Sequence, residues 1–345
     1  MKRPTIDDVA AFSGVARVTV SRVLNDGPNV RPEVRERVRR AVETLGYKVN
    51  PQARFLAGGA ARQLTLVHES VLDAEPNSYY HSALELGAMR GCVQRGYALS
   101  PLGLDPDDKG YVRRLLDLVE SGRSDGVMLT PPFSDDVELV RALVLRKSPV
   151  VCIAGGPAIR AVTATIGVDD EAAGFELGRY IIGLGHRRLG YINGPEGHVS
   201  ATYRLKGLMR AVAEAGAGVE VVAECGDFTF RSGIVLAERL LARRGDITAL
   251  VCANDDMAAG AMLTAHRQGL AIPGQVSISG FDDTPVSEII WPPLTTIHQP
   301  IRLIGQQAVE LLVDAIEAGR GAAEAGFRTV PFKVVERAST GPIRL

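Results

Sequence analysis

The segment from residue 16 to residue 25 carries hydrogen-bonding and cationic side chains on one predicted helix face. Residues on this face recur at the spacing i, i+1, i+4, i+5 and i+8, and they are Arg17, Val18, Ser21, Arg22 and Asn25. The opposite stripe is apolar and consists of Val20, Val23 and Leu24. An Arg side chain can bond to both O6 and N7 of guanine, whereas Val offers apolar contact, for example to a thymine methyl group. The pattern therefore predicts an amphipathic helix whose outer face can read base edges.

Two preceding segments would position this face. Thr5 and Asp8 have the spacing of a capping box, which predicts a short helix through Phe12, followed by a tight turn at 13–15. Two short helices joined by a turn that contains Gly are typical of a helix-turn-helix, whose second helix lies in the DNA major groove. Side chains that can bond phosphates, and so position the head without reading sequence, are Thr5, Thr19, Ser21 and Asn25.

A third helix and a weak helical segment follow. Pro32 suits the first position of a helix whose apolar residues form one stripe, and Gly46 suits its C-cap. Residues 50–57 then begin with Asn-Pro, which favours a helix start, and stop at Gly58-Gly59. This segment is too short to be a stable helix alone, so we expect it to fold only when something holds it.

The charge is divided unevenly along the chain. The formal net charge is -1, but residues 1–57 hold 11 Lys and Arg against 6 acids, and the remainder holds 28 against 34. A small basic head on a mildly acidic body suits a head that docks on phosphates. Because the basic region coincides with the helix-turn-helix pattern, we expect double-stranded DNA as a partner.

The remaining residues alternate between short apolar runs and helix-length amphipathic segments. The predicted strands are 64–67, 126–129, 150–153, 189–192, 219–223, 249–252 and 276–279. The predicted helices include 80–95, 172–184, 203–215, 232–243 and 257–268. Alternation of strands and helices indicates parallel sheets covered on both faces, and about a dozen strands exceed one ordinary sheet. We therefore expect two α/β lobes, with ligand-binding residues just after the strands.

Several classes of protein are excluded by what the sequence lacks. It has no G-x-S-x-G, P-loop or H-E-x-x-H motif and no G-x-G-x-x-G between a strand and a helix, so we expect no enzyme. The four cysteines have no metal-ligand spacing and are interpreted as small buried residues, so we expect no metal and no cofactor. Neither a signal-peptide pattern nor a membrane-spanning run is present, which indicates a cytoplasmic protein without membrane contact.

The head resembles the LacI/GalR (lactose-repressor) family of bacterial transcription regulators over about sixty residues. The resemblance rests on T-I-D-D-V-A-A-F-S-G-V-A-R-V-T-V-S-R-V-L-N and L-G-Y-K-V-N-P-Q-A-R-F-L-A. It implies that Arg17 and Val18 choose the operator and that Arg22 contacts a base edge. It also implies that paired hinge helices insert Leu56, with Arg54 beside it, into the minor groove and kink the DNA. One departure is Ala16, where the family usually has a capping Ser, a loss that typically costs about 1 kcal/mol.

The same resemblance extends through the body, in G-H-R-R-L-G-Y-I-N-G-P, A-N-D-D-M-A-A-G, I-S-G-F-D-D-T and P-P-L-T-T-I-H-Q-P. It implies a fold like that of periplasmic sugar receptors. Arg204, Asn254 and Asp282 match positions that bond sugar hydroxyls, and Phe228 matches an aromatic that packs on the sugar ring. Asn254 could instead cap the helix that follows it.

Two further aromatic residues are candidates for the effector site. Tyr79 and Tyr80 are adjacent at a predicted helix start, so at most one is expected to face the ligand. Trp291 precedes Pro292-Pro293 in a predicted crossover between the lobes, where it either stacks on ligand or packs the hinge.

The resemblance and the composition together predict a ligand-responsive repressor with an all-α head and an α/β body like a periplasmic binding protein. The predicted domains are a DNA-binding head at 1–48, a hinge at 49–61 and an effector-binding and dimerisation domain at 62–345. A homodimer is expected to hold a pseudo-palindromic operator until a mono- or oligosaccharide releases it. Alternatives are a corepressed regulator with a non-sugar ligand, such as a nucleobase or phosphosugar, and a free sugar receptor.

Overall fold

The head is a three-helix unit closed around a small apolar core. The computed structural model describes residues 4–24, 27, 29–47, 61–70, 78–216, 218–243, 247–319, 321 and 323–343. The head helices are α1 (Ile6–Ser13), α2 (Arg17–Leu24) and α3 (Pro32–Leu45). Its buried core consists of Val9, Val20, Val23, Val38 and Ala41. The predicted helix-turn-helix and third helix are therefore confirmed.

Local chemistry fixes the ends of the head helices as the sequence indicates. The Thr5 side chain accepts a hydrogen bond from the Asp8 backbone N–H at 3.3 Å, and the Asp8 carboxylate accepts one from the Thr5 N–H at 2.7 Å. Gly14 ends α1 with a φ of 65°, a left-handed conformation that turns the chain into α2. The α2 face that carries Val20 and Val23 is buried, which leaves the opposite face outward.

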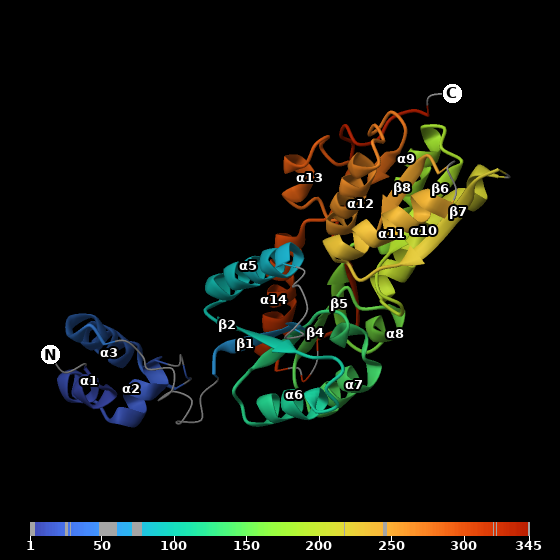
Figure 1. Ribbon diagram of the computed structural model, residues 1–345. Helices are drawn as coiled ribbons and strands as arrows, with labels where there is room; N and C mark the ends of the chain where they lie inside the picture. The colour runs from blue at the N-terminus through green and yellow to red at the C-terminus, as the bar shows by residue number, and fades with distance from the viewer. Residues whose placement is uncertain are drawn as a thin grey trace.

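The first lobe of the body is built on a six-stranded parallel sheet in the order β11-β5-β4-β3-β1-β2 (Figure 1). Its strands are β1 (Gln63–Glu69), β2 (Ala98–Leu104), β3 (Gly126–Leu129), β4 (Val150–Ile153), β5 (Ala164–Gly167) and β11 (Gly326–Thr329). One face packs on α5 (Ser78–Arg95) and α14 (Ile301–Glu317), and the other on α6 (Tyr111–Glu120) and α7 (Val137–Leu145). Short helical turns η1 (Phe133–Asp135) and α8 (Pro157–Arg160) follow β3 and β4.

The second lobe is built on a four-stranded parallel sheet in the order β7-β6-β8-β9. Its strands are β6 (Arg188–Asn193), β7 (Glu220–Cys225), β8 (Ala249–Cys252) and β9 (Ser277–Ser279). It is flanked by α9 (Asp170–Gly183), α10 (Val199–Ala215), α11 (Phe230–Arg243), α12 (Asp255–Arg267) and the short α13 (Val286–Ile289). Beside it, β10 (Thr296–His298) and β12 (Lys333–Val335) form an antiparallel pair. Two parallel-sheet lobes confirm the predicted fold class.

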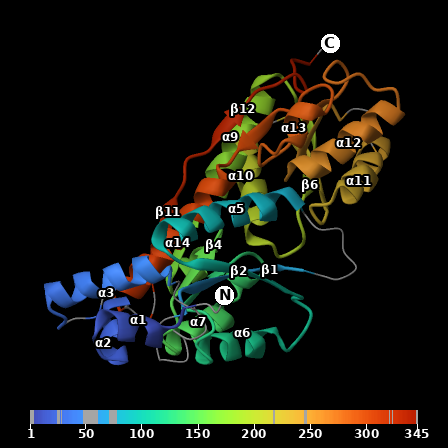
Figure 2. The same ribbon diagram turned by 90° about the vertical axis from the view of Figure 1, so that its left-hand side faces the viewer.

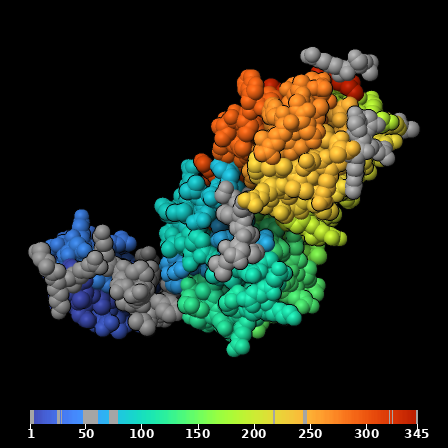
Figure 3. Space-filling model, in the orientation of Figure 1, coloured from blue at the N-terminus to red at the C-terminus, as the bar shows by residue number. Residues whose placement is uncertain are grey.

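The chain passes between the lobes where β5 leads to α9, where β10 leads to α14 and where β11 leads to β12. Figure 2 shows the last of these crossings, from β11 in the first lobe to β12 beside the second. In Figure 3 the blue-green to green residues of the first lobe lie directly beside the yellow to orange residues of the second lobe. None of the helices in the described part of the chain is long and apolar enough to cross a membrane.

Five strands were absent from the predicted set, and their composition explains why. Strand β2 contains Pro101 and Gly103, lies at the sheet edge and is only partly buried, so it lacks a strand-like apolar run. Strand β5 is fully buried, but its sequence Ala-Thr-Ile-Gly has one large apolar residue, and β11 is a partly exposed edge strand. Strands β10 and β12 are three residues each. Cys225 also differs from expectation, because it is exposed while the other three cysteines are buried.

Candidate functional site

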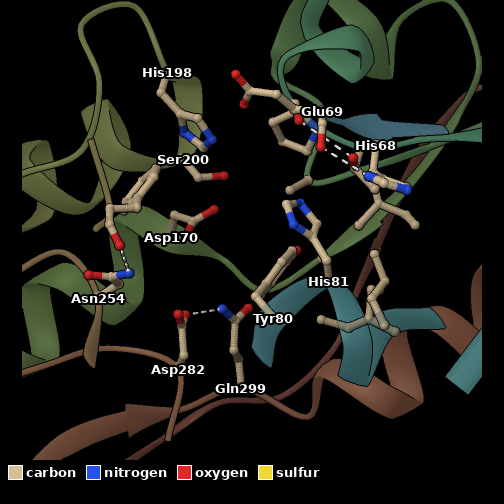
Figure 4. A pocket seen from close by; sticks show the side chains of 18 of the residues that line it. His68, Glu69, Tyr80, His81, Asp170, His198, Ser200, Asn254, Asp282 and Gln299 are labelled. Atoms are coloured by element: carbon tan, nitrogen blue, oxygen red, sulfur yellow. Dashed lines mark hydrogen bonds between the residues drawn. The ribbon is translucent and has the colours of Figure 1, made fainter. Parts of the chain in front are cut away.

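A cavity of about 720 Å³ lies between the two lobes and is lined by residues that follow strands of both sheets (Figure 4). The first lobe contributes His68 and Glu69 from the end of β1, together with Tyr80 and His81 from the start of α5. Figure 4 shows Asp170, His198, Ser200 and Asn254 on the wall opposite Tyr80 and His81, with Asp282 and Gln299 at one end. The position beyond the carboxyl ends of parallel strands is the one predicted for a ligand.

Arg204 is a buried cation at the cavity wall that is fixed by several contacts. It lies in the second turn of α10 and is 8% exposed. Its Nε donates to Asp170 Oδ1 at 2.8 Å, and its Nη1 donates to the Ala253 carbonyl at 2.7 Å. Its guanidinium carbon lies 3.6 Å from the Phe281 ring centroid, so one flat face of the group is covered. The guanidinium is therefore held by two hydrogen bonds and a stacked ring at the cavity wall.

Asp282 follows β9 and is buried beside Arg204. Its Oδ1 accepts a hydrogen bond from Gln299 Nε2 at 2.5 Å and lies 3.9 Å from Arg204 Nη1. Burial raises the pKa of Asp282 to about 7, although the charge of Arg204 and the bond from Gln299 oppose that rise. Gln299 lies in the crossover from β10 to α14, so this hydrogen bond joins the cavity wall to a connection between the lobes.

Asn254 and Phe228 line the cavity together. Asn254 caps α12, because its Oδ1 accepts from the Met257 N–H at 2.9 Å, and its Nδ2 donates to the Phe228 carbonyl at 2.9 Å. The helix cap and the cavity wall are thus the same side chain. Phe228 has a φ of 66°, and its ring lies directly over Gly194, where a Cβ would come within 2.2 Å of the ring. This Gly leaves room for an aromatic face on the cavity wall.

The first turn of α10 adds two residues that sequence reasoning missed. His198 caps α10 by accepting from the Ala201 N–H at 3.4 Å, and its ring meets Phe228 edge-on at 5.0 Å. Burial and the charge of Arg204 lower the pKa of His198 to about 4, so its imidazole is neutral at physiological pH. Ser200 is 3% exposed, and its Oγ has no hydrogen-bond partner within the described chain. Figure 4 shows that this hydroxyl points into the cavity.

Two of the six predicted effector-site residues do not line the cavity. Trp291 is 80% exposed, and only its carbonyl oxygen is engaged, accepting a hydrogen bond from His266 Nε2 if that nitrogen is protonated. Tyr79 and Tyr80 both pack against the hydrophobic core, but of the two Tyr80 alone lines the cavity, because consecutive residues of a helix face different directions. The other four, Arg204, Phe228, Asn254 and Asp282, line it together. Asp170 and Gln299 were missed, because the strands they follow, β5 and β10, were not predicted.

Nothing in the described residues suggests a metal site. No group of three or more His, Cys, Asp or Glu side chains there is arranged to hold a metal ion. The carboxylate neighbours Asp282 and Asp283 point apart, because Asp283 pairs with Arg337 Nη2 at 2.7 Å and His298 Nδ1 at 2.8 Å. The arrangement can bind a polar ligand by hydrogen bonds and by an aromatic face.

The second candidate site is the outward face of α2. Val18 is 61% exposed, Arg22 is exposed, and the Arg17 side chain is 66% exposed and 3.6 Å from Asp7. Thr19 and Ser21 are partly buried at the edges of this face. The Thr5 hydroxyl is already engaged in the capping box with Asp8.

The remaining predicted DNA contacts lie outside the described residues. They are Asn25 at the end of the recognition segment, and Arg54 and Leu56 in the predicted hinge.

A helix-turn-helix head joined to a two-lobed α/β body with a polar cavity defines a class, the transcription regulators that respond to a small ligand. Comparison with known proteins narrows that class. Residues 5–50 match the bacterial regulatory proteins of the lacI family, and residues 179–340 match the periplasmic binding protein-like domain. The chain is 32% identical to the HTH-type transcriptional regulator CelR of Thermobifida fusca, with 91% of this chain and 92% of CelR covered. The chain belongs to the LacI family.

Other relatives agree with this assignment. The HTH-type transcriptional repressor CytR of Escherichia coli K12 is 31% identical, with 97% of this chain and 96% of CytR covered. A CelR–cellobiose complex has a TM-score of 0.72 at 30% identity and covers 98% of this chain and 100% of that one. The lac repressor dimer bound to operator and the anti-inducer ONPF has a TM-score of 0.80 at 28% identity, with coverages of 99% and 100%.

Proposed function

We propose that this protein is a repressor that binds a pseudo-palindromic operator as a homodimer and releases it when a sugar enters the cavity. The proposed sugar response rests on the buried polar groups that converge beside the Phe228 ring. The unpartnered Ser200 hydroxyl, the remaining N–H groups of Arg204 and the Asp282 carboxylate supply donors and acceptors for hydroxyl groups. An apolar face with a few converging polar groups is what a pyranose requires.

The DNA half of the proposal rests on the exposed face of α2. Arg17 and Val18 are proposed to choose the operator sequence, and Arg22 to contact a base edge. Thr5, Thr19, Ser21 and Asn25 are proposed phosphate contacts, and Arg54 and Leu56 are proposed to act in the minor groove. The corresponding domains are the head at 1–48, the hinge at 49–61 and the effector-binding body at 62–345. We infer that the chain acts by binding alone, without catalysis.

Cellobiose in the CelR complex makes a sugar the favoured effector class, and the cavity of about 720 Å³ has room for more than one sugar ring. Coupling requires that the sugar bind the closed arrangement of the lobes more tightly than the arrangement that holds the hinges together on DNA.

Replacing Asp282 tests the effector role directly. Asp282→Ala should bind operator DNA within about threefold of the wild type, because Asp282 lies in the body, but an effector sugar should no longer release it. The measurement is fluorescence anisotropy of labelled operator DNA at fixed salt, since phosphate-driven affinity depends on salt. Asp117→Asn on the exposed surface of α6 is the control and should release normally. An Asp282→Ala protein that also releases normally would remove Asp282 from the effector site.

A further inference from the structure

The charged groups that line the cavity are mostly carboxylates. Among its described lining residues, Arg204 is the only Lys or Arg. The acidic lining residues are Glu69, Glu85, Asp170, Asp227 and Asp282. His198 adds no positive charge near neutral pH, because burial lowers its pKa to about 4.

The positive charge of Arg204 is already compensated by neighbouring carboxylates. A guanidinium holds a phosphate or carboxylate by two parallel N–H bonds, and here Nε is bonded to Asp170 and Nη1 to the Ala253 carbonyl. The charge of the group is also matched by Asp170, and Asp282 lies 3.9 Å away. The other N–H groups of the guanidinium can donate to a ligand, but an anion bonded there would lie close to the carboxylates of Asp170 and Asp282.

The pKa values of two acidic lining residues are shifted in opposite directions, so Asp227 is held in its charged form and Glu69 takes up a proton more readily. Asp227 Oδ1 accepts from the Thr229 N–H at 2.9 Å and from its hydroxyl at 2.6 Å. Burial opposes ionisation of Asp227, but these bonds and one involving Ser232 outweigh it and lower its pKa, so the carboxyl is charged. Burial raises the pKa of Glu69, and the charges of Asp105 and Asp107 raise it further.

A smaller cavity of about 170 Å³ shares Asp170 and Ser200 with the main one and does not change this balance. The Lys or Arg among its described lining residues is Arg160, which lies 3.6 Å from the Phe327 ring centroid and donates to the Gly155 carbonyl at 3.0 Å. Its acidic lining residues are Asp169, Asp170 and Glu171.

We propose that the cavity selects an uncharged sugar and rejects the phosphorylated or carboxylated form of the same sugar. This inference rests on the proposed function, and it names the chemical form of the effector. An anion that entered would leave water without gaining a paired cation and would face several carboxylates. A sugar that is phosphorylated as it enters the cell is therefore not the signal, whereas the same sugar delivered unmodified is.

The test is isothermal titration calorimetry of the full-length protein at about pH 8, where an imidazole of ordinary pKa is uncharged. The probes are cellobiose, lactose, maltose and ribose, each beside its monophosphate. We expect at least one neutral sugar to bind and its monophosphate to bind about tenfold more weakly or worse. A monophosphate that binds as tightly as its parent sugar would overturn the inference and leave the proposed function intact. If neither form of any sugar binds, the proposed sugar response fails, and the inference fails with it.

Removing one carboxylate from the cavity wall should reduce the preference for a neutral sugar over its monophosphate. Asp227→Asn keeps the size of the side chain and an oxygen acceptor for Thr229 but removes the charge, so the ratio of the two dissociation constants should fall at least threefold. Glu69→Gln provides a second variant at a different place on the wall, in case Asp227→Asn folds poorly. Asp117→Asn on α6 is the matched control, because it removes an exposed carboxylate that does not line the cavity. If the ratio falls equally in Asp117→Asn, or if it falls in neither Asp227→Asn nor Glu69→Gln, the cavity carboxylates do not set the selectivity.

Discussion

At the scale of a single residue, the buried carboxyl of Asp282 destabilises the folded state when it is ionised. Its carboxyl is buried, with one hydrogen bond from Gln299 and a guanidinium at 3.9 Å. These partners do not replace the water that the charged form loses, so its pKa lies near 7 instead of 3.8. The folded protein therefore retains a proton that the unfolded chain releases at lower pH.

The consequence is a pH-dependent stability difference between wild type and Asp282→Asn. Below about pH 4 the carboxyl is protonated in both the folded and the unfolded states, so it costs nothing. Between about pH 4 and pH 7 the unfolded chain ionises first, so the wild type loses stability relative to Asp282→Asn, and above about pH 7 the difference is constant. We expect a gain for the variant on the order of 1–4 kcal/mol at pH 8, from about 1.4 kcal/mol per pKa unit. Thermal unfolding of both proteins at pH 4 and at pH 8 measures this difference. A wild type whose stability rises relative to that of Asp282→Asn between pH 4 and pH 8 would contradict the raised pKa.

The residues that the sequence could and could not indicate differ in where their partners lie. Arg204 and Asp282 sit just after strand ends or inside motifs of the family, so position along the chain was enough to single them out. Ser200 and Asp170 depend on contacts across the fold, such as the bond between Asp170 and Arg204, which are 34 residues apart. The choice between Tyr79 and Tyr80 depends on the rotation of α5, which no local pattern sets.

At the scale of elements, helix pairs of the body cross where a glycine of one helix meets the backbone of the other. A Cβ on Gly87 of α5 would lie 1.9 Å from the Arg302 carbonyl oxygen of α14, and one on Gly233 of α11 would lie 2.2 Å from that of Met257 in α12. The third pair matters most for the site, because a Cβ on Gly174 of α9 would lie 2.1 Å from the carbonyl oxygen of Arg204 in α10. The glycines involved are Gly87, Gly305, Gly174, Gly207, Gly233 and Gly260.

We therefore predict that Gly174→Ala damages both stability and effector binding. The methyl group must push α10 away, which should lower the free energy of unfolding by about 1–3 kcal/mol and displace Arg204 from Asp170. Denaturant unfolding and sugar calorimetry measure the two effects. Gly183→Ala at the end of the same helix is the control, because its Cβ meets nothing within 4 Å, and it should be neutral or stabilising by up to about 1 kcal/mol. Equal behaviour of the two variants would contradict the close crossing.

Helices and strands were predictable where the apolar residues recur with a clear period or form an unbroken run. Strands β3, β4 and β8 have the predicted bounds, because each is a short apolar run buried over its whole length. The edge strand β2 and the three-residue β10 and β12 lack such a signal, because their pairing is decided by neighbours far along the chain. The helix-turn-helix was marked by its capping box and Gly14, which act locally.

At the scale of the whole molecule, the cavity and the connections between the lobes are physically joined. Asp282 and Gln299 belong to the cavity wall, and Gln299 also lies in the crossover from β10 to α14. Asp170 pairs with Arg204 at the start of α9, directly after the crossover from β5. A ligand that bonds Asp282 and Arg204 therefore acts on side chains beside two of the crossings, which lets ligand binding bias the arrangement of the lobes.

The measurement that tests this account most directly is operator binding by the full-length protein, followed by fluorescence anisotropy on its own upstream DNA. The complex is titrated at fixed salt with neutral sugars, including cellobiose. The account predicts that one class of neutral sugar lowers operator affinity by at least tenfold, while affinity for unrelated DNA changes little. An operator affinity that rises with the sugar, or that no sugar changes, would contradict sugar-released repression.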